Sequence, residues 1–193
     1  MDKCKWCSKK TDEYGMVSLL MNENEQSILV CNKCYNECMA DILNIDDYNG
    51  FEREAIFKDC DNVEHKFHII KRINPTGVLW EAIEFLDWDE IGYLFQLNQD
   101  FKDNPNEILK TFYKRIEDGL SRKYIKKEML YGREYYSLKD DRAEGRIEWD
   151  EMHEGHIPKL IIDGGEYSLD EIGKMMMSYE GWNFKLEIIE PTE

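Results

Sequence analysis

The sequence lacks the patterns that mark several large classes of proteins. It has no run of about eighteen apolar residues, the length that a membrane-spanning helix requires. It also lacks the GxxxxGKS or GxxxxGKT motif of P-loop nucleotide binding, the GxSxG setting of a serine nucleophile and the glycine-rich fingerprint of dinucleotide binding. The first residues enter a cysteine motif at once, without an apolar stretch of the signal-peptide kind. We therefore expect a cytoplasmic protein that neither crosses a membrane nor carries one of these catalytic motifs.

Positive charge is also scarce. The 193 residues include 25 lysines and arginines against 41 aspartates and glutamates, so the net charge at pH 7 is −16. Residues 1–50 carry −4, residues 51–130 carry −3 and residues 131–193 carry −9. This balance argues against non-specific binding to nucleic acids or to anionic membranes, since both attract basic surfaces. We interpret the acidic C-terminal third as solvated surface, with mimicry of a nucleic-acid backbone as the less favoured alternative.

Four of the six cysteines stand in two CxxC pairs, Cys4 with Cys7 and Cys31 with Cys34. Two pairs at this separation are typical of a tetrahedral zinc site, because each pair supplies two thiolates and the intervening segment can form a hairpin. Four thiolates close the coordination sphere and leave no position for a water nucleophile. The sequence therefore predicts one structural Zn²⁺ ion, whose binding energy is largely folding energy.

Residues 1–48 are predicted to fold as a treble clef around this metal. The apolar stretches at 16–20 and 27–30 flank a polar tip at 22–25, which predicts a hairpin. A thiolate at a helix N-terminus gains from the helix dipole, which helps to keep it deprotonated. The second cysteine pair is predicted to open such a helix, with one face formed by Cys34, Cys38, Ile42 and Ile45.

The opening CxxC pair and the run from Ile28 to Ile42 resemble the zinc-binding domain at the front of the ClpX unfoldase. In that family the second CxxC pair likewise follows an apolar strand, and a further cysteine follows four residues later, the position of Cys38 here. The resemblance covers residues 4–43 and implies a treble clef that often pairs with itself and contacts protein partners. The gap between the CxxC pairs is somewhat longer here and the ATPase motif is absent, so no unfoldase activity is implied. Cys38 and Cys60, which are not needed as ligands, are predicted to be small buried side chains.

Residues 49–129 are predicted to form an antiparallel meander covered by a helix. Three strands are expected, at 65–70, 78–85 and 92–97, with a turn between the first two. Asn104 and Pro105 are typical of a helix N-terminus. Apolar residues at helical spacing should then cover one face of the sheet: Leu109, Phe112, Ile116 and Leu120.

Residues 130–193 are predicted to repeat a smaller α+β arrangement, either separate or packed on the preceding part as one domain. Strands are expected at 145–149 and 158–162, then a tight turn and a helix with a capping box of Ser168 and Glu171. A last, half-buried strand is expected where apolar and polar residues alternate, at Trp182, Phe184, Leu186 and Ile188. Residues 161–164 and 179–182 resemble those of a bacterial domain of unknown function, which implies no activity. The chain as a whole is assigned to the α+β class.

Two groups of histidines are candidates for chemistry. Asp150, His153 and His156 lie in one acidic loop that could bind a divalent cation or act in acid–base catalysis, although a solvated turn is favoured. His65 and His68 are three residues apart, so on a strand they point to opposite faces, which disfavours a shared metal. An enzyme with its site near Asp150, His153 and His156 is retained as one alternative function.

The one basic patch is predicted to lie on a helix at 107–127, and its members are Lys110, Lys114, Arg115, Arg122, Lys123, Lys126 and Lys127. Nucleic-acid binding through this helix and the zinc module is a further alternative, although a solvated face, or one paired with the chain's own acidic C-terminal part, is favoured. Trp6 lies between the first two predicted ligands, where an exposed aromatic ring would suit a protein contact. Our leading hypothesis is a non-enzymatic interaction or adaptor protein that contacts a protein partner, or a second copy of itself, through the zinc module.

Overall fold

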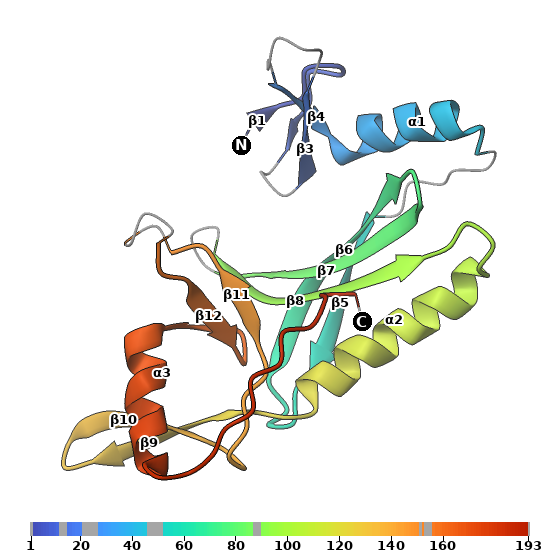
Figure 1. Ribbon diagram of the computed structural model, residues 1–193. Coiled ribbons are helices and arrows are strands. Elements are labelled where there is room, and N and C mark those ends of the chain that lie inside the picture. Colours follow the sequence, from blue (N-terminus) through green and yellow to red (C-terminus); the bar gives the residue numbers. More distant parts are fainter. Residues whose placement is uncertain are drawn as a thin grey trace.

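The computed structural model describes residues 2–11, 15–20, 27–45, 52–86, 90–150, 152 and 156–192. Within these residues the chain combines α-helices with antiparallel sheets, so the predicted α+β class is confirmed. An N-terminal module with the CxxC cysteines, a four-stranded sheet with a long helix, and a C-terminal group of hairpins follow one another (Figure 1). No helix of the described residues has the length and apolar character needed to cross a membrane.

The N-terminal module consists of two strand pairs and one helix. Its elements are β1 (Asp2–Lys3), β2 (Lys10–Thr11), β3 (Met16–Leu20), β4 (Ser27–Cys31) and α1 (Asn32–Leu43). β3 and β4 form the predicted antiparallel hairpin, with Met16 opposite Cys31, whereas the predicted tip at 22–25 lies outside the described residues. The order of cysteine turn, hairpin and helix is the one that the sequence predicted.

Helix α1 buries a different face from the predicted one. Its buried residues are Asn36 and Ala40, whereas Ile42 is exposed. The side chain of Asn36 accepts a hydrogen bond from the N–H of Ile73 at 2.8 Å and donates one to the carbonyl of Lys71 at 2.9 Å. Both groups belong to β6 (Glu64–Asn74). They lie beyond Ile70, the last residue of β6 that pairs with the preceding strand at 52–58. The amide of Asn36 thus supplies the donor and the acceptor that a further strand would supply, and it holds the module against the sheet.

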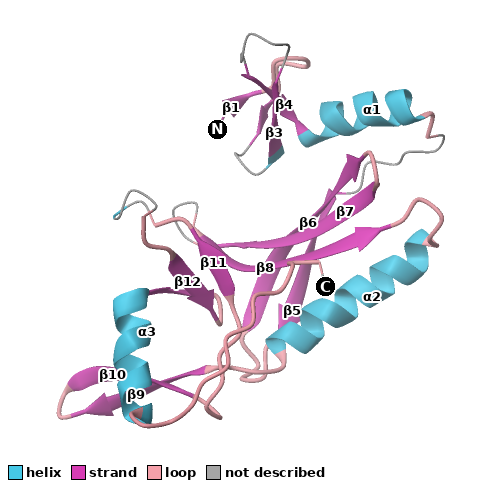
Figure 2. Ribbon diagram, in the orientation of Figure 1, coloured by secondary structure: helices cyan, strands magenta, loops and turns pink. Residues whose placement is uncertain are grey.

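The central sheet is an antiparallel meander of β5 (Glu52–Lys58), β6, β7 (Gly77–Phe85) and β8 (Ile91–Gln99), adjacent in that order. The three predicted strands are found, and β5 is an additional one. Helix α2 (Pro105–Leu120) begins after Asn104, whose side chain accepts the N–H of Asn106, and it lies across one face of the sheet (Figure 2). The core between helix and sheet contains Phe67, Ile69, Trp80, Ala82, Phe112, Ile116 and Leu120. The predicted apolar helix face is therefore confirmed.

The C-terminal part has two small sheets and a short helix. Its elements are β9 (Ile125–Leu130), β10 (Arg133–Leu138), β11 (Arg146–Glu148), β12 (Lys159–Ile162), β13 (Gly165–Ser168), α3 (Leu169–Met176) and the 3₁₀ turn η4 (Met177–Tyr179). The predicted turn and capping box are both present, with Ser168 and Glu171 bonded reciprocally.

Two predictions for this region are wrong. The basic helix expected at 107–127 ends at Leu120, because the carboxylate of Asp163 accepts the N–H groups of Tyr124 and Ile125, both at 2.7 Å, and so removes the donors that would continue the helix. The last strand expected from Trp182 onward is absent, and the segment follows an extended path without a strand partner among the described residues (Figure 2). Its alternating pattern predicts a strand but does not say which strand it pairs with.

Candidate metal centre

The four predicted metal ligands come together between the turn after β1 and the junction of β4 with α1. Cys4 and Cys7 belong to the turn after β1, Cys31 ends β4 and Cys34 lies in the first turn of α1. Their four sulfur atoms all lie within 4.8 Å of one another, and the Sγ atoms of Cys7 and Cys31 are 3.7 Å apart. Zinc–sulfur bonds of about 2.3 Å in a tetrahedron give sulfur–sulfur edges of roughly 3.8 Å. The geometry therefore fits a single tetrahedral metal ion.

The donor set restricts which metal would fit. All four donors are soft sulfurs, and four sulfurs in a tetrahedral arrangement suit zinc or iron rather than magnesium or calcium. Elsewhere in the described residues, no group of three or more His, Cys, Asp or Glu side chains brings its ligand atoms as close. Among the described residues, the cysteine cluster is therefore the one group of this kind that could hold a metal ion.

The electrostatics of the cluster favour a bound cation. Burial by itself would raise the pKa of the Cys4 thiol. The backbone N–H groups of Cys31, Cys7 and Trp6 stabilise the thiolate more strongly than burial disfavours it, and the pKa is lowered to about 6. Burial raises the pKa of Cys31 and of Cys34, and for Cys34 the neighbouring sulfurs add to the effect. Four thiolates this close repel one another, so without a cation some of them keep their protons. A divalent metal removes that repulsion and allows all four to ionise.

The sulfur cluster is also the core of the N-terminal module. Cys4 and Cys31 are buried with Met16 and Val30, and Val17, Leu19, Ile28, Cys34 and Tyr35 pack around them. A core of this size is too small to support a fold without a further link. Metal binding and folding of the module are therefore expected to be coupled.

The two remaining cysteines are less buried than predicted. Cys38 is half-buried on α1 and Cys60 is exposed. Cys60 stands in the turn after β5, where its backbone N–H donates to the carbonyl of Leu120 at 3.0 Å. The backbone of this turn makes the contact with α2, and the Cys60 side chain is exposed to solvent. The prediction of a buried Cys60 is wrong.

His65 belongs to a buried charged cluster that the sequence did not reveal. Its Nδ1 lies 2.6 Å from Oε1 of Glu84 and its Nε2 lies 3.3 Å from Oδ2 of Asp59, which also accepts from Nζ of Lys123 at 2.8 Å. Burial raises the pKa of Asp59, but Lys123, His65 and two backbone N–H groups together hold it well below its usual range. The two carboxylates face different ring nitrogens, so the group offers no shared metal position. Glu84 and Lys123 are distant in sequence from the other two members, which is why no spacing pointed to the cluster.

The other histidine candidates are not brought together in the described residues. His68 contacts Glu54 at 3.5 Å rather than the carboxylates around His65. Of the predicted acidic loop, the Asp150 carboxylate accepts the N–H of Met152 at 2.9 Å and His156 is exposed, while His153 lies outside the described residues. This geometry adds no support to an enzyme site near Asp150.

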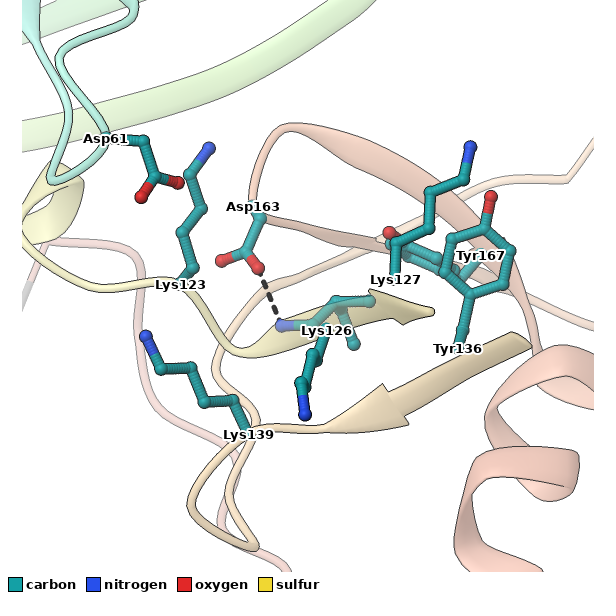
Figure 3. A pocket seen from close by; sticks show the side chains of 9 residues that line it. Asp61, Lys123, Lys126, Lys127, Tyr136, Lys139, Asp163 and Tyr167 are labelled. Carbon is teal, nitrogen blue, oxygen red and sulfur yellow. Dashed lines mark hydrogen bonds between the residues drawn. The ribbon is translucent and has the colours of Figure 1, made fainter. Parts of the chain in front are cut away.

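Three lysines of the predicted basic helix, Lys123, Lys126 and Lys127, instead line an open pocket of about 770 Å³ beside β9 and β10. Figure 3 shows that the side chains of Lys123, Lys126, Lys127 and Lys139 point in different directions. Lys123 is paired with Asp59, Lys127 with Glu134 at 2.6 Å, and Lys126 with Glu128. The amino groups therefore do not converge on one ligand position. Of the three carboxylate partners only Glu134 lies in the acidic C-terminal part, so the expected pairing with that part is found for Lys127 and not for the other two lysines.

Comparison with known proteins gives three matches, all to family models described as domains of unknown function. DUF7685 matches residues 3–46, DUF7686 matches residues 41–121 and DUF7713 matches residues 124–193. No curated protein and no solved structure matches the chain. The matches agree with the predicted likeness to a domain of unknown function, and they show no similarity to the ClpX zinc-binding domain.

Proposed function

We propose that the N-terminal module is a zinc-stabilised treble clef that acts as a protein-interaction module and carries out no catalysis. The observation that carries this proposal is the closed set of four sulfurs, all within 4.8 Å of one another. A metal held by four protein thiolates has no open position for substrate or water, so its role is to fold the module. Zinc is the metal we assign, because it suits four thiolates without adding redox chemistry.

The surface of the module supports the interaction role. Trp6, Leu20 and Leu29 have exposed fractions of 42%, 77% and 40%, and we call these three residues the module patch. The N–H of Lys5 donates to the carbonyl of Leu29 at 2.9 Å, so the turn that carries Trp6 lies beside β4. Leu20 and Leu29 lie diagonally across the β3–β4 hairpin. Exposed aromatic and aliphatic side chains on a rigid frame are typical anchors of protein interfaces.

The test is co-purification with the tagged full-length protein from its native source. The combined variant Trp6→Ala and Leu29→Ser should lose the captured partner while it keeps its metal. The matched control is Trp149→Ala, which removes an equally large exposed ring outside the module. Capture that survives the module-patch variant unchanged, or that is lost in the Trp149 control as well, would contradict the proposal.

A further inference from the structure

The segment from Trp182 to Ile189 is an exposed apolar stretch without a strand partner among the described residues. Trp182, Phe184, Leu186 and Ile188 have exposed fractions of 66%, 79%, 76% and 69%, and they alternate with Asn183, Lys185 and Glu187. Within the described part of the chain, no backbone–backbone hydrogen bond involves residues 183–190. The segment therefore has the sequence of a strand and the unsatisfied edges of a strand.

Both ends of the segment are fixed to the body. At its start, the N–H of Trp182 donates to the carbonyl of Tyr179 at 2.9 Å, and the two rings meet edge to face. At its end, the guanidinium of Arg115 donates to the carbonyls of Thr192 and Pro191, at 3.0 and 3.1 Å. Figure 1 shows the chain running between these anchors from the end of α3 to β8 and α2. An anchored, extended chain loses less entropy on pairing than a free tail does.

The sequence of this segment is complementary to itself. If two copies lie antiparallel about a two-fold axis at Leu186, Lys185 of each copy lies opposite Glu187 of the other, and Phe184 lies opposite Ile188. Phe184, Leu186 and Ile188 then share one face of the pair, and the charged side chains share the other with Asn183 and Ile189. A two-fold axis at Lys185 or at Glu187 would instead place like charges opposite each other, which is unfavourable. A shift of one residue between the strands would place apolar side chains opposite charged ones.

We propose that residues 183–189 pair with the same segment of a second copy, as two antiparallel strands centred on Leu186. The occupant of the apolar face is thus a second copy of this chain, selected by the match of Lys185 with Glu187. The arrangement is isologous, as in most homodimers. It uses a different surface from the module patch and does not depend on the metal.

The first test exchanges the charges in the full-length protein and measures dimerisation by analytical ultracentrifugation. Lys185→Glu alone, or Glu187→Lys alone, turns both symmetric pairs repulsive and should raise the dissociation constant by roughly tenfold or more. The double variant Lys185→Glu with Glu187→Lys restores both pairs and should dimerise like the unmodified chain. A monomeric unmodified chain, single variants that dimerise normally, or a double variant as weak as the singles would each overturn the proposal. Pairing with β8 of the same chain, or with a different protein, would give the first of these results.

The second test fixes the register by oxidation in a Cys60→Ser background. Leu186→Cys places two thiols directly opposite each other, within the roughly 4.4–6.8 Å range of Cα separations that a disulfide spans. The matched control is Lys185→Cys, whose two copies lie two residues out of register and beyond that range. The Leu186 variant should form a covalent dimer and the Lys185 variant should not. Equal crosslinking of the two variants, or none in either, would contradict the two-fold register.

Discussion

Replacing Asn36 by alanine would remove the side chain that holds the N-terminal module against the central sheet. Asn36 is 1% exposed, and its amide pairs with the N–H of Ile73 and the carbonyl of Lys71. The carbonyl keeps a second donor, Asn32, at 2.8 Å, whereas no other partner for the Ile73 N–H is seen in the described residues. Two lost hydrogen bonds of about 1 kcal/mol each and one orphaned buried donor give an expected loss of about 2–4 kcal/mol.

The matched control for this prediction is Asn32→Ala. Asn32 lies one helical turn away and donates to the same Lys71 carbonyl, which Asn36 continues to satisfy, so the expected cost is about 0.5–1.5 kcal/mol. The assay is urea unfolding, with the slope m unchanged between variants. Amide hydrogen exchange at Ile73 should speed up in the Asn36 variant and remain slow in the Asn32 variant. Equal costs for the two variants, or unchanged exchange at Ile73, would refute the reasoning.

Three further stability predictions can be checked by the same unfolding assay. Gly119→Ala should destabilise by about 1–3 kcal/mol although alanine favours helices, since its Cβ would clash with the ring of Phe95, and Phe95→Leu should relieve that cost. Asp59→Asn should cost about 2–4 kcal/mol at pH 7, since it breaks the buried pair with Lys123. Because folding lowers the pKa of Asp59 below the unfolded value of about 3.9, this contribution is present above that pH, and the difference between the proteins should shrink as the pH falls below it. Ser168→Ala should cost about 1 kcal/mol through loss of the α3 cap, and an equally stable variant would contradict the role of that cap.

The sequence predicted those features that depend on local spacing. The CxxC pairs, the strands on either side of the turn at Gly77 and the cap at Asn104 each depend on residues close together in the chain. The apolar face of α2 was also predictable, because its apolar residues recur at helical spacing in the sequence, whatever sheet the helix covers. The proximity of the four sulfurs follows from the predicted hairpin.

The features that the sequence did not predict depend on contacts between distant residues. From the sequence, Asn36 is expected to be a polar surface residue of a helix. Its hydrogen-bond partners belong to β6, which lies far away in the sequence. The basic residues after Leu120 read as a continued helix, because the carboxylate of Asp163 that redirects the chain lies far ahead in the sequence. The segment after Trp182 shows its strand pattern plainly, but a pattern with a period of two residues does not identify a partner.

The central claim, a structural zinc ion held by Cys4, Cys7, Cys31 and Cys34, is tested most directly by elemental analysis of the purified full-length protein. We predict one zinc ion per chain, lost in Cys34→Ser and retained in Cys38→Ser, which makes the same change four residues further along α1. The CD and NMR signals of the N-terminal module should disappear together with the metal in the Cys34 variant. A metal-free unmodified protein, iron in place of zinc, or full zinc content in the Cys34 variant would contradict the claim.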